Sequence, residues 1–157
     1  MSRLISTMSE KYTQLVQVSN MPILILEIGQ GLSKVGFAGE PHPRAIVKTP
    51  KTFAKNLHDF ENNKNTRKPV IDFLFKLYKN HLHTSPQAHK IILIEDITGN
   101  RIFFERIVQC LFVSLRVPVI CTLPSSILVP YATGLLKKSH LICNFGYQNT
   151  RLVPLLK

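Results

Sequence analysis

The stretch ILILEIGQGLSKVGFAGEPHPR, residues 23–44, decides the fold of this chain. Ile23–Ile28 is a continuous apolar run that ends in the glycine turn Gly29–Gly31, a pattern that predicts a buried strand entering a tight hairpin. Ser33–Ala38 and Ala45–Val47 are the expected next two strands, because a segment rich in glycine and proline separates them. We therefore expect a three-strand antiparallel meander at the start of the folded region.

Later segments alternate between helical and strand patterns, which predicts a mixed sheet with flanking helices, an α/β fold. Three helices are expected: one that begins at Pro69, one over Asn100–Leu115 and one over Ser125–Thr133. The expected strands are Ile91–Glu95, Val119–Thr122, Leu141–Phe145 and Thr150–Leu156.

Helical spacing predicts which side chains share a face in the first two helices. In the first helix they are Val70, Leu74, Leu77, Tyr78 and His81. In the second they are Phe103, Ile107, Cys110, Leu111 and Ser114. Residues 49–69 are instead polar and rich in lysine and asparagine, so we expect a loop or a reduced insertion there. Residues 1–20 are expected to form a polar extension without the apolar core of a signal peptide.

Length and composition suit one domain with a buried core, and they exclude a wholly disordered chain. The chain has 157 residues, 45% of them hydrophobic, and a formal charge of +11. A positive charge can attract nucleic acid, but Asp59 and Glu61 interrupt the basic residues of segment 44–68 and no nucleic-acid-binding motif accompanies them. A solvated basic face is the expected explanation, with no nucleic-acid partner.

The stretch Val117–Leu136 has no charged residue and is long enough to cross a bilayer. Three prolines, Pro118, Pro124 and Pro130, would interrupt a membrane helix where no water could satisfy its backbone. A short buried strand followed by a short buried helix explains the same residues better. We therefore expect no membrane insertion.

The cysteines and histidines of the chain give no metal or disulfide pattern. The three cysteines form no CxxC pair and are expected to be core thiols in a reducing compartment: Cys110, Cys121 and Cys143. Three histidines lie close together without a carboxylate at ligand spacing, and are expected at the surface: His81, His83 and His89. No metal site is expected from these residues.

The glycine turn Gly29–Gly31 could expose backbone N–H groups to phosphate oxygens, with Lys34 adding a positive charge three residues later. Spacing alone favours an ordinary hairpin. The longer string from Gly36 to Glu40, followed by Pro43-Arg44, resembles the opening of the actin family, which carries Gly-Phe-Ala-Gly-acidic-x-x-Pro-Arg after an Asp-x-Gly-Ser-Gly turn and a lysine.

This resemblance implies an actin-like (ribonuclease H-like) fold over residues 21–157, a mixed sheet with flanking helices. It covers only the N-terminal portion of such proteins, so the domain would be partial, ending after the second phosphate-loop hairpin. Residues 49–69 would be a reduced form of the subdomain used in polymerisation. The hairpin Leu141–Leu156 should then leave apolar surface exposed, and the chain alone should be marginally stable or aggregate.

The later segments are most similar to the divergent actin-related proteins of the dynactin pointed end. The similar segments are Lys90–Glu95, Phe103–Pro118, Leu123–Ser125, Leu141–Tyr147 and Leu152–Pro154. The likeness implies a cytoplasmic, cytoskeletal structural subunit. Its partners would be the terminal actin-related protomer and the other pointed-end subunits, and it would cap the filament and support dynein-driven transport on microtubules.

In the actin family, two glycine turns clamp the phosphates of ATP with a metal ion alongside. The resemblance assigns to the first turn Glu27, Gly29, Gln30, Gly31 and Lys34. To the second it assigns Asn144, Phe145 and Gly146. Ser125 stands where actin has the glutamine that positions water, and Asn144 replaces an aspartate.

These departures lead us to expect no ATP hydrolysis and no catalytic residue, because hydrolysis needs a positioned water and charge compensation. ATP with Mg²⁺ is expected to bind this chain weakly or not at all. Two alternatives stay open: an actin-like ATPase, favoured by Glu27 and Lys34, and a nuclear actin-related chromatin subunit, favoured by the basic charge.

Overall fold

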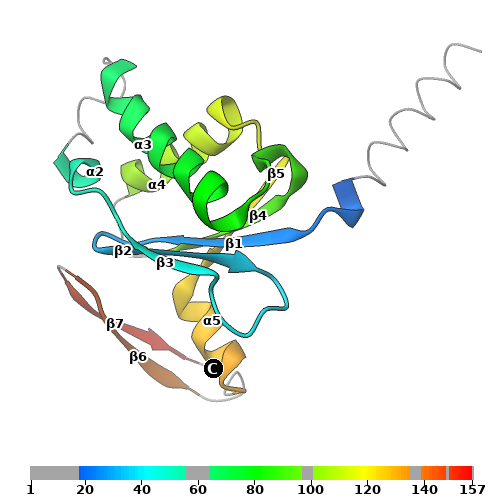
Figure 1. The fold of residues 1–157 in the computed structure, drawn as a ribbon. Helices are drawn as coiled ribbons and strands as arrows, with labels where there is room; N and C mark the ends of the chain where they lie inside the picture. The colour runs from blue at the N-terminus through cyan, green and yellow to red at the C-terminus, as the bar shows by residue number, and fades with distance from the viewer. Residues whose placement is uncertain (1–17, 56–63, 97–100, 135–138, 148, 157) are drawn as a thin grey trace, which may run out of the picture.

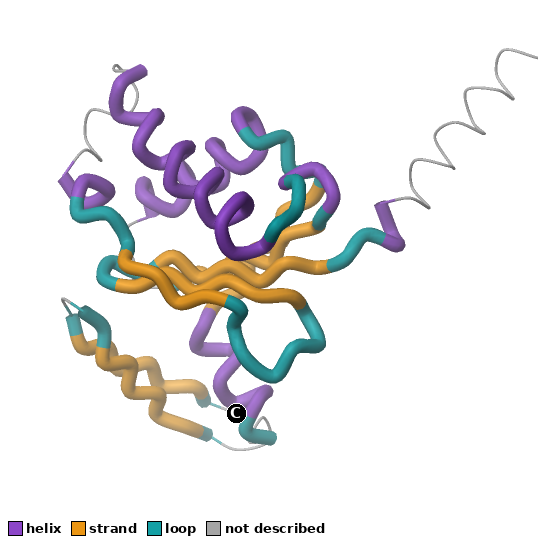
Figure 2. The backbone as a smooth tube through the Cα atoms, in the orientation of Figure 1, coloured by secondary structure: helices purple, strands orange, loops and turns teal. Residues whose placement is uncertain are grey.

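The computed structural model describes residues 18–55, 64–96, 101–134, 139–147 and 149–156, which form two sheets with helices around them (Figures 1 and 2). The larger sheet has five strands in the order β3-β2-β1-β4-β5. These strands are β1 (Ile23–Ile28), β2 (Leu32–Phe37), β3 (Ala45–Lys48), β4 (Lys90–Glu95) and β5 (Val119–Pro124). The smaller sheet is a hairpin of β6 (His140–Phe145) and β7 (Thr150–Leu155).

The strand pairing confirms the meander and the mixed α/β sheet. β1 pairs antiparallel with β2, and β2 pairs antiparallel with β3. On its other edge β1 pairs parallel with β4, and β4 pairs parallel with β5. The carboxyl ends of β1, β4 and β5 therefore lie at one edge of the sheet, where clefts for ligands usually form.

Two helices cover one face of the five-stranded sheet, and a third helix lies with the hairpin on the other face (Figure 1). The α-helices are α2 (Thr52–Lys55), α3 (Lys64–Leu77), α4 (Arg101–Gln109) and α5 (Ser125–Ala132). The shorter turns are η1 (Tyr78–Leu82), η2 (Pro86–Ala88) and η3 (Cys110–Ser114). α3 and α4 are on the first face, and α5 is on the second.

The core lies between the five-stranded sheet and helices α3 and α4. Alternate side chains of β1 and β4 point into it, as expected of a strand with one face against helices. The most deeply buried side chains are Leu24, Leu26, Leu74, Ile91, Leu93, Ile107 and Leu111. The apolar runs in the sequence thus form a single core cluster. This core holds the sheet against α3 and α4, next to the edge where the cavity lies.

The helical faces predicted from spacing are correct until each helix widens into a π-turn. His81 and Ser114 were expected on the buried faces, but both are exposed. Leu82 and Leu115 are buried instead, one residue later in each case. A π-turn adds one residue to the turn, so the buried face moves on by one position. In η3 this widening is visible in the bond from the N–H of Leu115 to the carbonyl of Cys110, at 3.1 Å.

The expectation of a loop over 49–69 is wrong at both ends, while residues 56–63 lie outside the described part. Thr49 and Phe53 are buried, and Phe53 lies in the short helix α2. α3 begins at Lys64, so Pro69 lies inside the helix rather than at its start. A proline there removes one backbone hydrogen bond, which the packing of the remaining helix against the sheet offsets.

Three further residues differ from the expected burial. His89 is buried, with Nδ1 3.0 Å from the Ser85 carbonyl oxygen and its ring 5.1 Å from that of Phe37, whereas a surface position was expected. His81 and His83 are exposed, so of the two expectations for His81 the surface position is the correct one. Cys110 is a core thiol, but two cysteines expected in the core are exposed, Cys121 on the edge strand β5 and Cys143 on β6.

The uncharged stretch 117–136 divides between β5 and α5 as expected, but neither element is buried as predicted. Ile127, Val129 and Tyr131 of α5 are 50%, 48% and 72% exposed. β5 is an edge strand, so one of its edges has no neighbouring strand. No helix in the described ranges has the length and apolar character needed to cross a bilayer. The extension expected over residues 1–20 falls mostly outside the described residues, which begin at Val18.

One face of the hairpin β6–β7, here called the outer face, is apolar and exposed, as the sequence led us to expect. Its residues form three cross-strand pairs: Leu141 with Pro154, Cys143 with Leu152, and Phe145 with Thr150. Leu141, Leu152 and Phe145 are 62%, 61% and 80% exposed. None of the six side chains is charged.

Candidate functional site

The candidate site contains two glycine turns that are closed by the same kind of backbone hydrogen bond. In the turn between β1 and β2, the N–H of Gly29 donates to the carbonyl oxygen of Leu32 at 3.0 Å. In the turn between β6 and β7, the N–H of Gly146 donates to the carbonyl oxygen of Asn149 at 2.9 Å. A Cβ atom would lie only 2.8 Å and 2.9 Å from those same oxygens, so each turn requires glycine.

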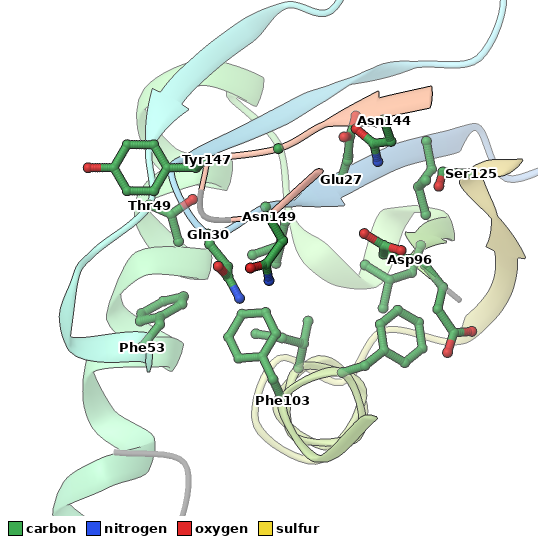
Figure 3. Close-up of a pocket in the computed structure, with 18 of the residues that line it drawn as sticks. Glu27, Gln30, Thr49, Phe53, Asp96, Phe103, Ser125, Asn144, Tyr147 and Asn149 are labelled. Carbon is green, nitrogen blue, oxygen red and sulfur yellow. The ribbon is translucent and has the colours of Figure 1, made fainter. Parts of the chain in front are cut away.

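The two turns touch each other. A Cβ atom on Gly31 would come within 2.7 Å of the Tyr147 ring, so the ring packs directly on the backbone of the first turn. Beside this contact, a cavity of about 200 Å³ extends past the carboxyl ends of β1 and β4 to helix α4 (Figure 3). The cavity thus lies where two segments far apart in the sequence meet.

Most residues assigned to the two phosphate loops by resemblance do line this cavity. They are Glu27, Gly29, Gln30, Asn144 and Gly146, and Ser125 lines it as well. Lys34, Gly31 and Phe145 are not part of the lining. The ammonium of Lys34 pairs with the carboxylate of Glu27 at 3.0 Å, with both side chains well exposed.

Several lining residues were not found from the sequence. Asp96 follows β4 directly and forms an ion pair with Arg151 of β7, which joins the hairpin to the larger sheet. The position of Asp96 after a parallel strand was a usable signal, because side chains at that edge converge on ligand sites. Phe53 was missed because it lies in the polar segment expected to be a loop, and Phe103 was expected only as a core residue.

The charges around the cavity are mainly negative. The acidic residues Glu27, Glu95 and Asp96 line it. Among the described residues, Arg151 is the one cation in the lining, and it is already paired with Asp96. Beyond them, aromatic and aliphatic side chains form the opposite wall, among them Phe53 and Phe103 (Figure 3).

The residues that line the cavity suit a nucleoside triphosphate and its metal ion poorly. The N–H groups of Gly29 and Gly146 are consumed in closing their turns, and lining carboxylates repel phosphate. No cluster of three or more histidine, cysteine or acidic side chains suited to a metal occurs among the described residues. We therefore derive no chemical step through ATP or Mg²⁺.

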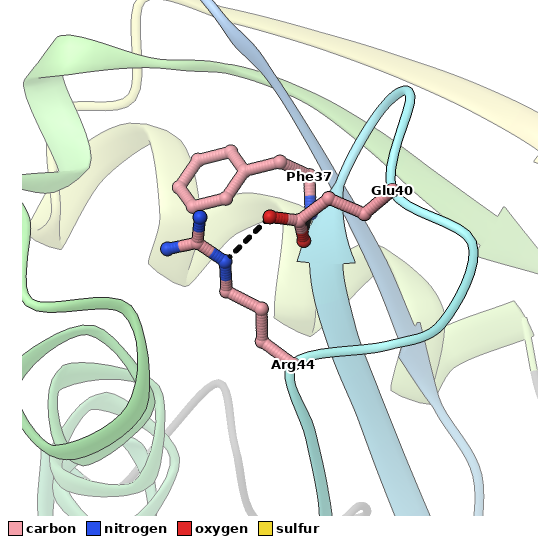
Figure 4. Close-up of polar contacts among 3 residues, drawn as sticks. All are labelled: Phe37, Glu40 and Arg44. Atoms are coloured by element: carbon pink, nitrogen blue, oxygen red, sulfur yellow. Dashed lines mark hydrogen bonds and ion pairs between the residues drawn. The ribbon is translucent and has the colours of Figure 1, made fainter.

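The segment from Gly36 to Arg44 forms a compact structural unit beside the sheet (Figure 4). Glu40 accepts hydrogen bonds from the N–H of Phe37 at 3.0 Å and from Nε of Arg44 at 2.7 Å. These contacts, that of Phe37 first, hold the pKa of the Glu40 carboxyl below its ordinary value. The Arg44 guanidinium lies 4.5 Å from the centre of the Phe37 ring, a cation–π contact.

Close packing explains the glycine and the proline of the same segment. A Cβ atom on Gly36 would lie 3.1 Å from the Cα atom of Pro43, closer than side chains normally approach. The residues of the Gly-Phe-Ala-Gly-Glu motif therefore close the loop between β2 and β3, and the motif has a structural role in this chain.

No family model matches the chain. The chain is 28% identical over 163 residues to actin-related protein 10 of Dictyostelium discoideum. The chain is similar to an actin-related protein. The match covers 84% of this chain and 34% of the relative, so the chain spans about a third of the length of the curated protein it matches. The match supports an actin-like relationship.

Proposed function

We propose that this chain is an actin-like, non-catalytic structural subunit of the dynactin pointed end. In this role it contacts the terminal actin-related protomer and the neighbouring pointed-end subunits, caps the filament and supports dynein-driven transport on microtubules. Its location would be cytoplasmic, on the cytoskeleton. The likeness to an actin-related protein over 84% of the chain is the observation that carries the proposal.

The unit formed by Phe37, Glu40 and Arg44 supports the actin-like part of the proposal. The residues that resemble the actin family are joined by hydrogen bonds and a cation–π contact, so they depend on one another. A match made of interdependent residues is less easily produced by chance than one made of isolated residues. The facing glycine turns, both closed by the same bond, support it further.

The composition of the cavity supports a non-catalytic role. Ser125 and Asn144 line it at the positions where the resemblance requires a glutamine and an aspartate. Serine is too short to hold a water in place of glutamine, and asparagine carries no charge to orient a metal. The acidic residues Glu27 and Asp96 line the same cavity and disfavour an anion, so the cavity offers little to a γ-phosphate.

Affinity capture of the full chain from cytosol tests the proposal. We expect dynactin pointed-end subunits among the captured proteins. Lys76→Ala, a change on the exposed face of α3, should retain them, whereas Leu93→Asp should lose them because Leu93 is 1% exposed in the core. Recovery of no dynactin subunit by the folded chain would contradict the proposal.

Measurement of ATP turnover separates this proposal from an actin-like ATPase. We expect turnover equal to the background without protein. Turnover well above background that is lost in Lys34→Ala would instead favour the ATPase.

A further inference from the structure

We propose that the cavity between the two glycine turns binds a small organic cation with an aromatic body, of the aralkylammonium class, in place of a nucleotide. The inference concerns the cavity alone and stands whether or not the chain associates with dynactin. It rests on the size of the cavity, its aromatic wall and its charge.

The volume of the cavity suits one ring with a short arm. At about 200 Å³, it is larger than an apolar cavity of about 150 Å³ that holds benzene in another protein. It is smaller than the range of about 300–1,000 Å³ usual for pockets that enclose drug-sized ligands. A nucleoside triphosphate needs a pocket larger than about 300 Å³, whereas a phenylethyl group fits into a smaller volume.

The wall contributed by α2 and α4 is aromatic and firmly held. Phe53 is 5% exposed and packs edge-on against Phe73, with the ring centres 5.2 Å apart. Its ring centre lies 6.1 Å from that of Phe103. Buried Ile107 lies in the same wall. Such a wall offers apolar contact to a ring and a π-face to a cation.

The acidic residues of the lining offer acceptors to an ammonium group. Two of these acidic residues already have cationic partners: Glu27 pairs with Lys34, and Asp96 pairs with Arg151. Glu95 lines the cavity without an ion-pair partner among the described residues. Its carboxylate is thus the acceptor available to a cation.

Neutral amides also line the cavity. Gln30 and Asn149 direct their side chains toward the Phe103 ring (Figure 3). Their oxygens can accept further hydrogen bonds from an ammonium group, while the carboxylates nearby disfavour any anion.

Ligand-observed NMR on the full chain tests this inference, with phenethylammonium as the probe. We expect saturable transfer from the protein to the ring protons of the probe. Its neutral analogue 2-phenylethanol should bind at least about fivefold more weakly, because it lacks the charge that pairs with a carboxylate and a π-face. Added Mg–ATP should not displace the probe.

Two variants locate the binding. Glu95→Gln keeps the shape of the side chain and should weaken phenethylammonium about fivefold or more, whereas Glu105→Gln, a matched change on the exposed side of α4, should leave it unchanged. Phe103→Leu should weaken the probe and its neutral analogue alike. Circular dichroism confirms that each variant is folded.

Three results would overturn the inference. They are the absence of saturable binding, equal affinity for the charged and neutral probes, and displacement of the probe by Mg–ATP. An unchanged affinity in folded Glu95→Gln would count against it equally.

Discussion

The ion pair between Arg151 and Asp96 joins β7 to the end of β4, and its removal should loosen the hairpin while leaving the five-stranded sheet intact. Arg151→Met removes the charge and keeps an apolar stem of similar length. The two side chains are 21% and 32% exposed, so the pair is intermediate between two known cases. An exposed pair contributes about 0–1 kcal/mol, and a charged hydrogen bond in a protein about 1.5–3 kcal/mol.

We therefore expect Arg151→Met to destabilise the docked hairpin by about 1–2 kcal/mol, which raises its opening equilibrium by about 5–30-fold. Hydrogen exchange measures this directly. Paired amides of β6 and β7 should exchange faster by that factor. Amides of β1 and β4 should keep their rates, because those strands are paired on both edges in the centre of the sheet.

A double-mutant cycle supplies the control. Asp96→Asn should produce a similar change, and the double variant should add little to either, since both single changes remove the same interaction. The reasoning is refuted if hairpin exchange is unchanged in Arg151→Met. It is also refuted if the amides of β1 and β4 accelerate as much as those of the hairpin, which would mean that the pair stabilises the whole fold.

Four further results are expected. Leu74→Ala should lower the free energy of unfolding, measured in urea, by about 2–5 kcal/mol, because the Leu74 side chain is fully buried. Phe75 is the exposed neighbour, and Phe75→Ala should lower the free energy of unfolding by less than about 1 kcal/mol. Equal losses would contradict the assigned face of α3. Glu40 has a lowered pKa in the folded chain, so its contribution is present above the pKa of the unfolded chain and is lost as the pH falls through the lower folded value. Glu40→Gln should therefore flatten the acid side of a plot of melting temperature against pH, and an unaltered plot would disprove the linkage. Phe145→Ser should reduce self-association of the chain in light scattering, since it breaks the apolar outer face of the hairpin; undiminished scattering would assign the association to another surface. Burial raises the pKa of Cys110 to about 11, so a thiol reagent at neutral pH should label the two exposed cysteines first and Cys110 only after denaturation, as peptide mass spectrometry would detect.

The order of strands and helices was predictable from the sequence because the apolar runs are long and their period is clear. Ile23–Ile28 and Ile91–Glu95 could each be recognised as buried strands with no knowledge of their partners. The π-turns could not be recognised, because a run such as Cys110–Ser114 suits an α-helix equally well. The shift of the buried position from Ser114 to Leu115 was therefore visible only in the structure.

The cavity was predictable in part. The glycine turns indicated where the chain bends sharply, and resemblance brought Gly29 and Gly146 together. Neither indicated the pairing of Lys34 with Glu27, which depends on their being opposite each other in the register of β1 and β2. The aromatic wall was missed because Phe53 stands among polar residues, where local composition outweighed the tertiary contact that buries it.

The contact between Gly31 and Tyr147 has a mechanical consequence. One side of the cavity belongs to the five-stranded sheet and the other to the hairpin, so the angle between the two sheets sets the width of the cavity. A compound wedged between the turns resists closure of that angle, and a partner that presses the hairpin inward expels the compound. Binding in the cavity and the position of the hairpin are therefore coupled, so that a change in one changes the other.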